Sequence, residues 1–143
     1  MTKNLNNKTS SVQGGEIYRD FTSSFDSDIR MYSEDIDVSI AYSNMLSKIG
    51  VLTLDETNLI NSALEDIRNE IKNGTFKWDK KLEDIHLNIE NSMYDKIGEV
   101  AGKLHFGRSR NDQVATDSRL YFIRKIDFLN TLIIDFLQEL VKL

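Results

Sequence analysis

The chain has 143 residues, enough for one domain with its own core, and 40% of them are hydrophobic and 29% charged. A net charge of −5 argues against a general nucleic-acid surface, and the absence of cysteine excludes disulfides and thiolate metal sites. No apolar run is long enough to span a membrane, and residues 1–15 lack the apolar core of a secretory signal. We therefore expect a cytoplasmic protein that needs no metal or cofactor, since two histidines also argue against a histidine metal site.

The first fifty residues predict a polar tail and one helix. Residues 1–15 offer little to bury and are expected to form a flexible tail, and residues 16–36 are too mixed to assign. From Asp37 the pattern becomes helical and ends at Gly50. The face expected to point inward consists of Val38, Ala41, Tyr42, Met45 and Ile49.

Two more helices are expected before residue 100. Thr53 and Glu56 match a capping box, and Asn73-Gly74 is a typical helix end. The inward face of this helix is predicted to be Ile60, Leu64, Ile67 and Ile71. Residues 75–81 form a connector that carries Trp78, the only tryptophan. The next helix follows Glu83-Asp84 and carries Ile85, Ile89, Met93 and Ile97 at a spacing of four, with a glycine-bearing loop over residues 98–107.

The last segment predicts a helix that is apolar around much of its circumference. Its apolar seam is Phe122, Ile126, Leu129, Ile133, Phe136, Leu140 and Leu143. The apolar surface is widened by Ile123, Leu132, Ile134 and Leu137. So wide an apolar surface is typical of a helix buried in a bundle. Because the pattern has no cap or polar close, we expect either a truncated piece of a longer protein or cover from partner chains. Strand-like alternation is absent from the sequence, so the predicted fold class is all-α.

The densest cluster of polar groups lies at the start of this helix, over residues 108–113. Arginine, serine and asparagine side chains at a helix entrance suit a ligand with several carboxylates, because guanidinium groups bind carboxylates through two N–H groups. The small Gly107 and Ser109 leave room for close backbone approach. The alternative interpretation is a solvated helix entrance in which the arginines pair with Asp112 or Asp117.

Residues 102–117 read Gly-Lys-Leu-His-Phe-Gly-Arg-Ser-Arg-Asn-Asp-Gln-Val-Ala-Thr-Asp. This string resembles the first conserved block of argininosuccinate lyases, where Phe106 is usually threonine. The upstream Glu83-Asp84-Ile85-His86 is similar to the family's Glu-Asp-Ile-His segment, and the resemblance covers about residues 14–143. It implies an N-terminal helical lyase domain over residues 16–113, followed over residues 114–143 by the first part of a central helix bundle.

The resemblance also implies an activity: cleavage of argininosuccinate to arginine and fumarate by β-elimination, within a homotetramer whose sites combine several subunits. By resemblance the substrate-binding residues are Ser24, Ser109, Arg110 and Asn111. Asn111 ranks first, because its amide can both donate and accept, and Arg110 is expected to bind a substrate carboxylate. The residues expected to support them are Asp84, His86 and Arg108, although Asp84 and His86 also fit a plain helix terminus with a hydrogen-bonded histidine.

The chain departs from the family pattern in two places. The usual Trp-Gly-Gly-Arg-Phe start appears only as Gln13-Gly14-Gly15-Glu16-Ile17. The sequence also lacks two family motifs that are associated with proton transfer, a Thr-His pair and a Gly-Ser-Ser-x-Met-Pro-x-Lys loop. The catalytic residues are therefore unknown, and the 143 residues alone are expected to be inactive. Two other functions remain open: a non-catalytic structural protein on the same scaffold, and a helical module that binds dicarboxylates.

Overall fold

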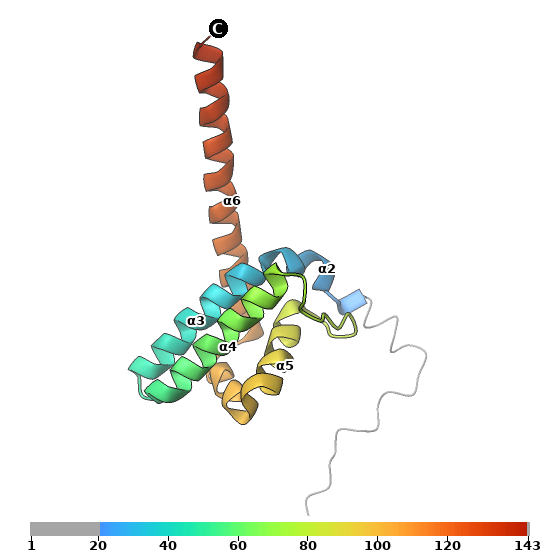
Figure 1. Ribbon diagram of the computed structural model, residues 1–143, viewed down its shortest axis with the longest axis vertical. Coiled ribbons are helices and arrows are strands. Elements are labelled where there is room, and N and C mark those ends of the chain that lie inside the picture. The colour runs from blue at the N-terminus through green and yellow to red at the C-terminus, as the bar shows by residue number, and fades with distance from the viewer. Residues whose placement is uncertain (1–20, 143) are drawn as a thin grey trace, which may run out of the picture.

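The computed structural model describes residues 21–142, and every regular element in that range is a helix (Figure 1). The all-α prediction is therefore confirmed for the described residues. The predicted flexible tail, residues 16–20 and Leu143 lie outside them. The elements are α2 (Phe25–Asp28), the 3-10 helix η1 (Ile29–Met31), α3 (Tyr32–Lys48), α4 (Leu54–Lys72), α5 (Ile85–Ile97), the 3-10 helix η2 (Gly98–His105) and α6 (Arg110–Val141).

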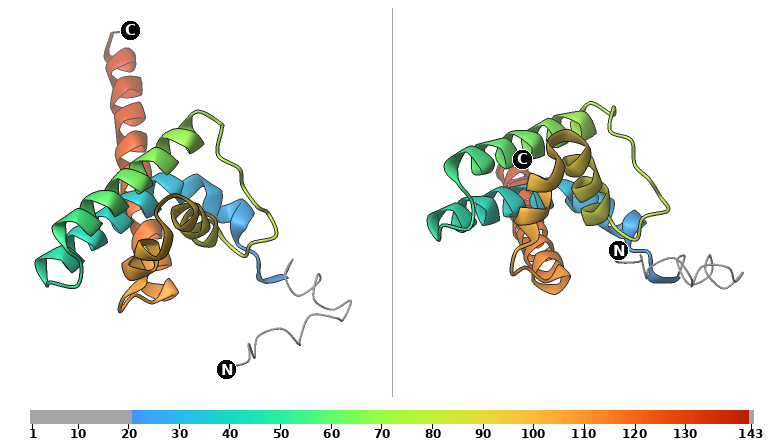
Figure 2. Two further views of the ribbon diagram at one scale, coloured as in Figure 1. Left: turned by 60° about the horizontal axis from the view of Figure 1, so that its bottom comes forward. Right: turned by 90° about the horizontal axis from the view of Figure 1, so that it is seen from below.

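Helices α3, α4 and α5 form a body from which α6 projects. Helices α3 and α4 lie side by side, α5 packs against α4, and α6 crosses α3 near its own start before it leaves the body (Figures 1 and 2). The core between these helices consists of Ile36, Leu46, Leu52, Ile60, Leu64, Ile67, Ile89, Met93, Ala101 and Leu104. Burial of this apolar surface is the main source of stability in such a body.

Helix α4 follows its sequence signals closely. The Thr53 side chain accepts a hydrogen bond from the Glu56 backbone N–H, and the Glu56 carboxylate accepts one from the Thr53 backbone N–H, so the predicted capping box is present. The predicted inward residues Ile60, Leu64 and Ile67 are fully buried, whereas Ile71 is only half-buried. The helix ends at Lys72, as the Asn73-Gly74 pair predicts.

The predicted inward face of α3 is wrong for three of its five residues, whereas Val38 and Tyr42 are half-buried and Tyr42 packs against the core. The helix begins at Tyr32, five residues before Asp37, and its buried stripe is Ile36, Ser39, Ser43 and Leu46. The expected Met45 and Ile49 are 36% and 62% exposed, and Ala41 is also exposed. Serine is small enough to let helices approach closely, so α3 presents a partly polar stripe to α4 and α6.

Helix α5 begins where its acidic entrance predicts. The Asp84 carboxylate caps the helix by accepting from the Leu87 backbone N–H at 2.7 Å. Of the predicted face, Ile85, Ile89 and Met93 are buried and Ile97 is half-buried. The connector before α5 carries no helix, and the ring of Trp78 forms T-shaped contacts with the rings of Phe25 and Phe76 there. The loop expected over residues 98–107 is instead mostly the 3-10 helix η2.

Helix α6 has 32 residues and runs without a break across the proposed domain boundary after residue 113. Its first turns are seated on the body, where Gln113 and Asp117 are buried. Beyond them its large apolar side chains are exposed within the single chain, for example Phe122 at 62% and Phe136 at 64%. No helix in residues 21–142 combines the length and apolarity that crossing a membrane requires.

Candidate functional site

The polar block begins at the N-terminal turn of α6. Gly107 turns the chain with φ at +67°, and Ser109 then takes the N-cap position in an extended conformation. The Ser109 Oγ accepts from the Asn111 backbone N–H at 2.9 Å. Ser109 and Asn111 are both exposed, so their side chains line the outer rim of the helix entrance. A helix N-terminus with exposed polar side chains favours an anionic ligand.

Arg110 points the other way, toward the body. Its Nη1 donates to the Gln113 Oε1 at 2.9 Å, and its Nε lies 3.2 Å from the Asp84 Oδ2. Its Nη2 lies 3.8 Å from the Glu90 Oε2, and the side chain remains 30% exposed. The alternative pairing with Asp112 or Asp117 is therefore wrong for Arg110, which instead binds Asp84, the N-cap of α5, and Glu90 within α5.

Arg108 supports the loop that precedes α6. Its Nη1 donates to the Ser39 Oγ at 3.1 Å, and its guanidinium carbon lies 4.9 Å from the centre of the Tyr42 ring. The Tyr42 hydroxyl in turn donates to the Phe106 carbonyl at 2.8 Å. Burial lowers the pKa of the Arg108 guanidinium, although Asp35 and Asp117 act against that shift. Arg108 thus connects the loop to α3 rather than facing solvent.

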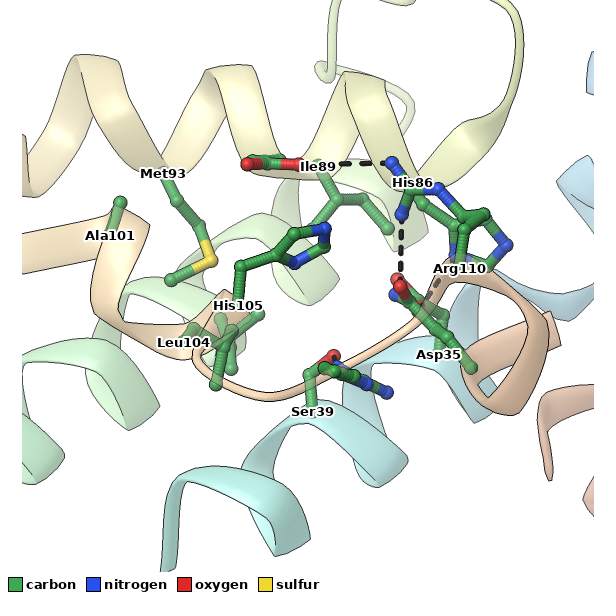
Figure 3. Close-up of a pocket in the computed structure, with 13 residues that line it drawn as sticks. Asp35, Ser39, His86, Ile89, Met93, Ala101, Leu104, His105 and Arg110 are labelled. Atoms are coloured by element: carbon green, nitrogen blue, oxygen red, sulfur yellow. Dashed lines mark hydrogen bonds and ion pairs between the residues drawn. The ribbon is translucent and has the colours of Figure 1, made fainter. Parts of the chain in front are cut away.

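Beneath Arg110 lies a cluster of buried ionisable residues, one from each of α3, α5 and α6. The His86 Nδ1 lies 2.9 Å from the Asp35 Oδ1 and 3.8 Å from the Asp117 Oδ2. All three side chains are at most 1% exposed. Asp35, His86 and Arg110 gather on one side of a small cavity of about 20 Å³, whereas Met93, Ala101 and Leu104 line the opposite side (Figure 3).

The protonation states of this cluster follow from its geometry. Burial alone would raise the pKa of Asp35, but the hydrogen bond and charge of His86 outweigh it and hold that pKa below its ordinary value. Burial would likewise lower the pKa of His86, and the Asp35 carboxylate reverses this and raises it. Burial and the nearby Asp35 charge raise the pKa of Asp117 to about 8. At neutral pH we therefore expect an ionised Asp35 and a largely protonated Asp117, and the raised pKa of His86 gives its imidazole more positive charge than an ordinary histidine carries.

The same three residues are also the types that bind metal ions. They offer ligand atoms within 4.8 Å of one another. However, the Asp35 Oδ1 already accepts from both His86 and the Gln113 Nε2, the latter at 2.5 Å. Two arginines close by, Arg108 and Arg110, supply positive charge as well. The geometry therefore favours a hydrogen-bonded cluster, and the absence of a metal site stays a prediction.

Ser24 contacts the segment just before α5 through a backbone hydrogen bond. Its N–H donates to the Glu83 carbonyl at 3.0 Å, which places Ser24 beside the residue that precedes Asp84. Its hydroxyl donates to the Asp28 carboxylate. The structure therefore joins Ser24 to the Asp84–Arg110 pair by way of Glu83, while Ser109 and Asn111 lie at the α6 entrance itself.

The sequence prediction missed three residues that shape the site: Asp35, Gln113 and Asp117. One signal was present, because Arg110, Gln113 and Asp117 are spaced three and four residues apart and so share one face of α6. No comparable signal existed for Asp35, because charged helical residues usually face solvent.

The residues of this site lie within the part of the chain that matches known proteins. A family model described as "Lyase" matches residues 9–143, which include the α6 entrance, the α5 entrance and the buried cluster. The chain belongs to this lyase family. The predicted family membership is thus confirmed.

Similar members of this lyase family carry the name argininosuccinate lyase. The chain is 53% identical over 109 residues to the one from Hahella chejuensis, which covers 76% of this chain and 23% of that relative. It is 51% identical over 110 residues to the one from Chromohalobacter salexigens, covering 77% and 24%. It is 48% identical over 128 residues to the one from Acinetobacter baumannii, covering 85% and 27%. The chain therefore spans about a quarter of the length of these curated relatives.

Proposed function

We propose that this chain forms one substrate-binding wall of an argininosuccinate lyase. The observation that supports the proposal most strongly is the coincidence of sequence and geometry at the α6 entrance. About half of the residues are identical to those of proteins named argininosuccinate lyase, and the chain presents Ser109 and Asn111 at an exposed helix N-terminus. That position suits the carboxylates of the succinyl group of argininosuccinate.

The reaction explains why such a wall is needed. A base removes a proton from the succinyl carbon beside a carboxylate, and the electron pair delocalises into that carboxylate. The pair then forms the double bond of fumarate while the carbon–nitrogen bond breaks, and the leaving guanidino nitrogen of arginine keeps the bonding pair and takes up a proton. Negative charge accumulates on the carboxylate before the bond breaks, so fixed donors around it lower the barrier.

Each proposed contact has a distinct role. Asn111 offers an amide that can donate to a carboxylate and accept from a guanidinium. Ser109 holds the first turn of α6 through its bond to the Asn111 N–H and leaves its own hydroxyl proton to donate. Arg110 contributes positive charge, with its orientation set by Asp84, and His86 acts through the buried cluster below.

We propose that the general acid and base of the reaction lie outside these 143 residues. Neither the Thr-His pair nor the Gly-Ser-Ser-x-Met-Pro-x-Lys loop of the family occurs in the 143 residues. The chain by itself is therefore proposed to be inactive. We also propose that the exposed apolar surface of α6 packs against other copies in a homotetramer, which would bring walls from several subunits together.

One observation favours the structural alternative, in which the scaffold serves without chemistry. Arg110 is already paired with Asp84 and Glu90, so its charge is partly neutralised before any substrate binds. A structural role and a catalytic role predict different behaviour at Asn111, because an exposed asparagine that binds nothing can be replaced at little cost.

A chimera tests the proposal. The matching segment of the Hahella chejuensis relative is replaced by that of this chain, and fumarate release from argininosuccinate is followed by its ultraviolet absorbance. We expect an active chimera, and a loss of about 10²–10³-fold in kcat for Asn111→Ala but not for the exposed control Asn58→Ala. A chimera that folds and assembles like its parent yet releases no fumarate, or an Asn111→Ala variant as active as its control, would contradict the proposal.

A further inference from the structure

Gln113 connects the proposed substrate site to the buried cluster. It lies one turn after Arg110 on α6, and only 5% of its surface is exposed. Its Oε1 accepts from the Arg110 Nη1 at 2.9 Å. Its Nε2 donates to the Asp35 Oδ1 at 2.5 Å, the same oxygen that contacts His86. One amide thus bridges a half-exposed guanidinium and a fully buried carboxylate.

The chemistry of the two partners demands an amide at this position. A guanidinium only donates hydrogen bonds and an ionised carboxylate only accepts them. The bridging group must therefore accept on one side and donate on the other, which a carboxylate, an ammonium or an apolar side chain cannot do. Because the partners differ in this way, the amide has one favourable orientation, and burial excludes water that could replace either contact.

Arg110 is held on its other edges by two acids, one at the N-cap of α5 and one within that helix. Asp84 contacts Nε and Glu90 lies near Nη2, while Gln113 binds Nη1. Two carboxylates already face one guanidinium, so a third at position 113 would give this group of residues a net charge of about −2. The neutral amide of Gln113 fixes the guanidinium without adding that charge.

We propose that Gln113 is a positioning residue, which fixes the direction of the Arg110 guanidinium and links it to the Asp35–His86 pair. The proposal rests on the proposed function for its claim that Arg110 serves a substrate site. Gln113 touches no substrate in this scheme and acts through Arg110. Binding of a carboxylate at Arg110 would be sensed through this link by His86, which lies beyond Asp35.

Two substitutions separate the two contacts of Gln113. Gln113→Met has similar length and loses both contacts. Gln113→Glu keeps an acceptor for Arg110 but places a carboxylate against Asp35. The exposed Gln138 on the same helix supplies the matched controls Gln138→Met and Gln138→Glu. The readouts are the rotation rate of the Arg110 guanidinium, followed by ¹⁵N exchange NMR, and the titration midpoint of His86, followed by imidazole NMR.

The two variants should respond differently. In Gln113→Met the guanidinium should rotate about tenfold faster than in Gln138→Met, since one charge-assisted hydrogen bond is lost. In Gln113→Glu rotation should stay slow, while the His86 midpoint should rise relative to Gln138→Glu, because negative charge is added near the imidazole. Unchanged rotation in Gln113→Met, or an unchanged His86 midpoint in Gln113→Glu, would overturn the proposal. If Gln113→Met does not fold, the Gln113→Glu midpoint decides.

A ligand titration separates this proposal from the proposed function. We expect argininosuccinate to bind the wild-type chain, measured by calorimetry, and to bind Gln113→Met about tenfold more weakly than Gln138→Met. If the wild-type chain binds no argininosuccinate while both NMR results appear, the proposed function fails and Gln113 still positions Arg110. If rotation changes but binding does not, the assignment of Gln113 to the substrate site is overturned.

Discussion

Asp117→Asn should make this protein more stable, by an amount that grows with pH. The Asp117 carboxyl is fully buried, and neither of its oxygens accepts a hydrogen bond from a described donor. Burial and the Asp35 charge raise its pKa from 3.8 to about 8, although His86 and Arg108 act in the opposite direction. The folded protein therefore keeps a proton that the unfolded chain releases at neutral pH, and this costs stability.

The magnitude follows from the two pKa values. Below about pH 4 both states are protonated at Asp117, and above about pH 8 both are ionised, so its contribution is flat in each range. Between those limits the free energy of unfolding falls by up to about 1.4 kcal/mol per pH unit. At neutral pH the cost is at most about 4 kcal/mol. An asparagine stays neutral in both states and avoids this cost.

Urea unfolding followed by circular dichroism, from about pH 5 to about pH 9, measures this difference. The gap between Asp117→Asn and wild type should widen with pH and then level off. The control Asp135→Asn, at an exposed position on the same helix, should show no such widening. A gap between Asp117→Asn and wild type that is constant across the whole range would refute the reasoning, because it would mean that Asp117 carries the same charge in both states.

Three further outcomes are expected. Thr53→Ala removes the cap of α4 and should lower the free energy of unfolding by about 1 kcal/mol in urea, and no change would mean that the cap contributes nothing. Wild-type protein should self-associate in sedimentation velocity at micromolar concentration, and Leu129→Asp with Ile133→Asp should reduce this; a wild-type monomer would contradict it. The midpoint of the His86 titration in NMR should lie above pH 6.5, because the Asp35 carboxylate stabilises the charged imidazole, and it should fall in Asp35→Asn. The stability that the Asp35–His86 pair adds is present below pH 6.5 and is lost as pH rises through the raised midpoint.

The sequence predicted the parts of this fold in which local signals and burial agree. Helix α4 is the clearest case, because its cap, its apolar spacing and its glycine end all point to the same helix. The entrance of α5 follows the same logic, since Asp84 both caps the helix and carries the charge that its first turn favours. At the site, the exposed positions of Ser109 and Asn111 agree with their expected role, and that role stays a prediction.

The misplaced inward face of α3 is linked to the buried polar cluster. Helix α3 carries two candidate stripes, and the more apolar one, with Met45 and Ile49, was predicted to face inward. The helix instead turns Asp35 and Ser39 inward, because Asp35 must reach His86 and Ser39 must accept from Arg108. Hydrophobic periodicity cannot detect this choice, since the contacts that decide it join residues far apart in sequence.

On the proposal that α6 packs against other copies, the exposed length of this helix makes the folding of the chain depend on its concentration. Beyond its first turns the helix packs against little within its own chain, and a helical segment in water without such packing is only marginally stable. Helix content should therefore rise as molecules associate. A melting temperature for this protein has a definite meaning only when the protomer concentration is stated with it.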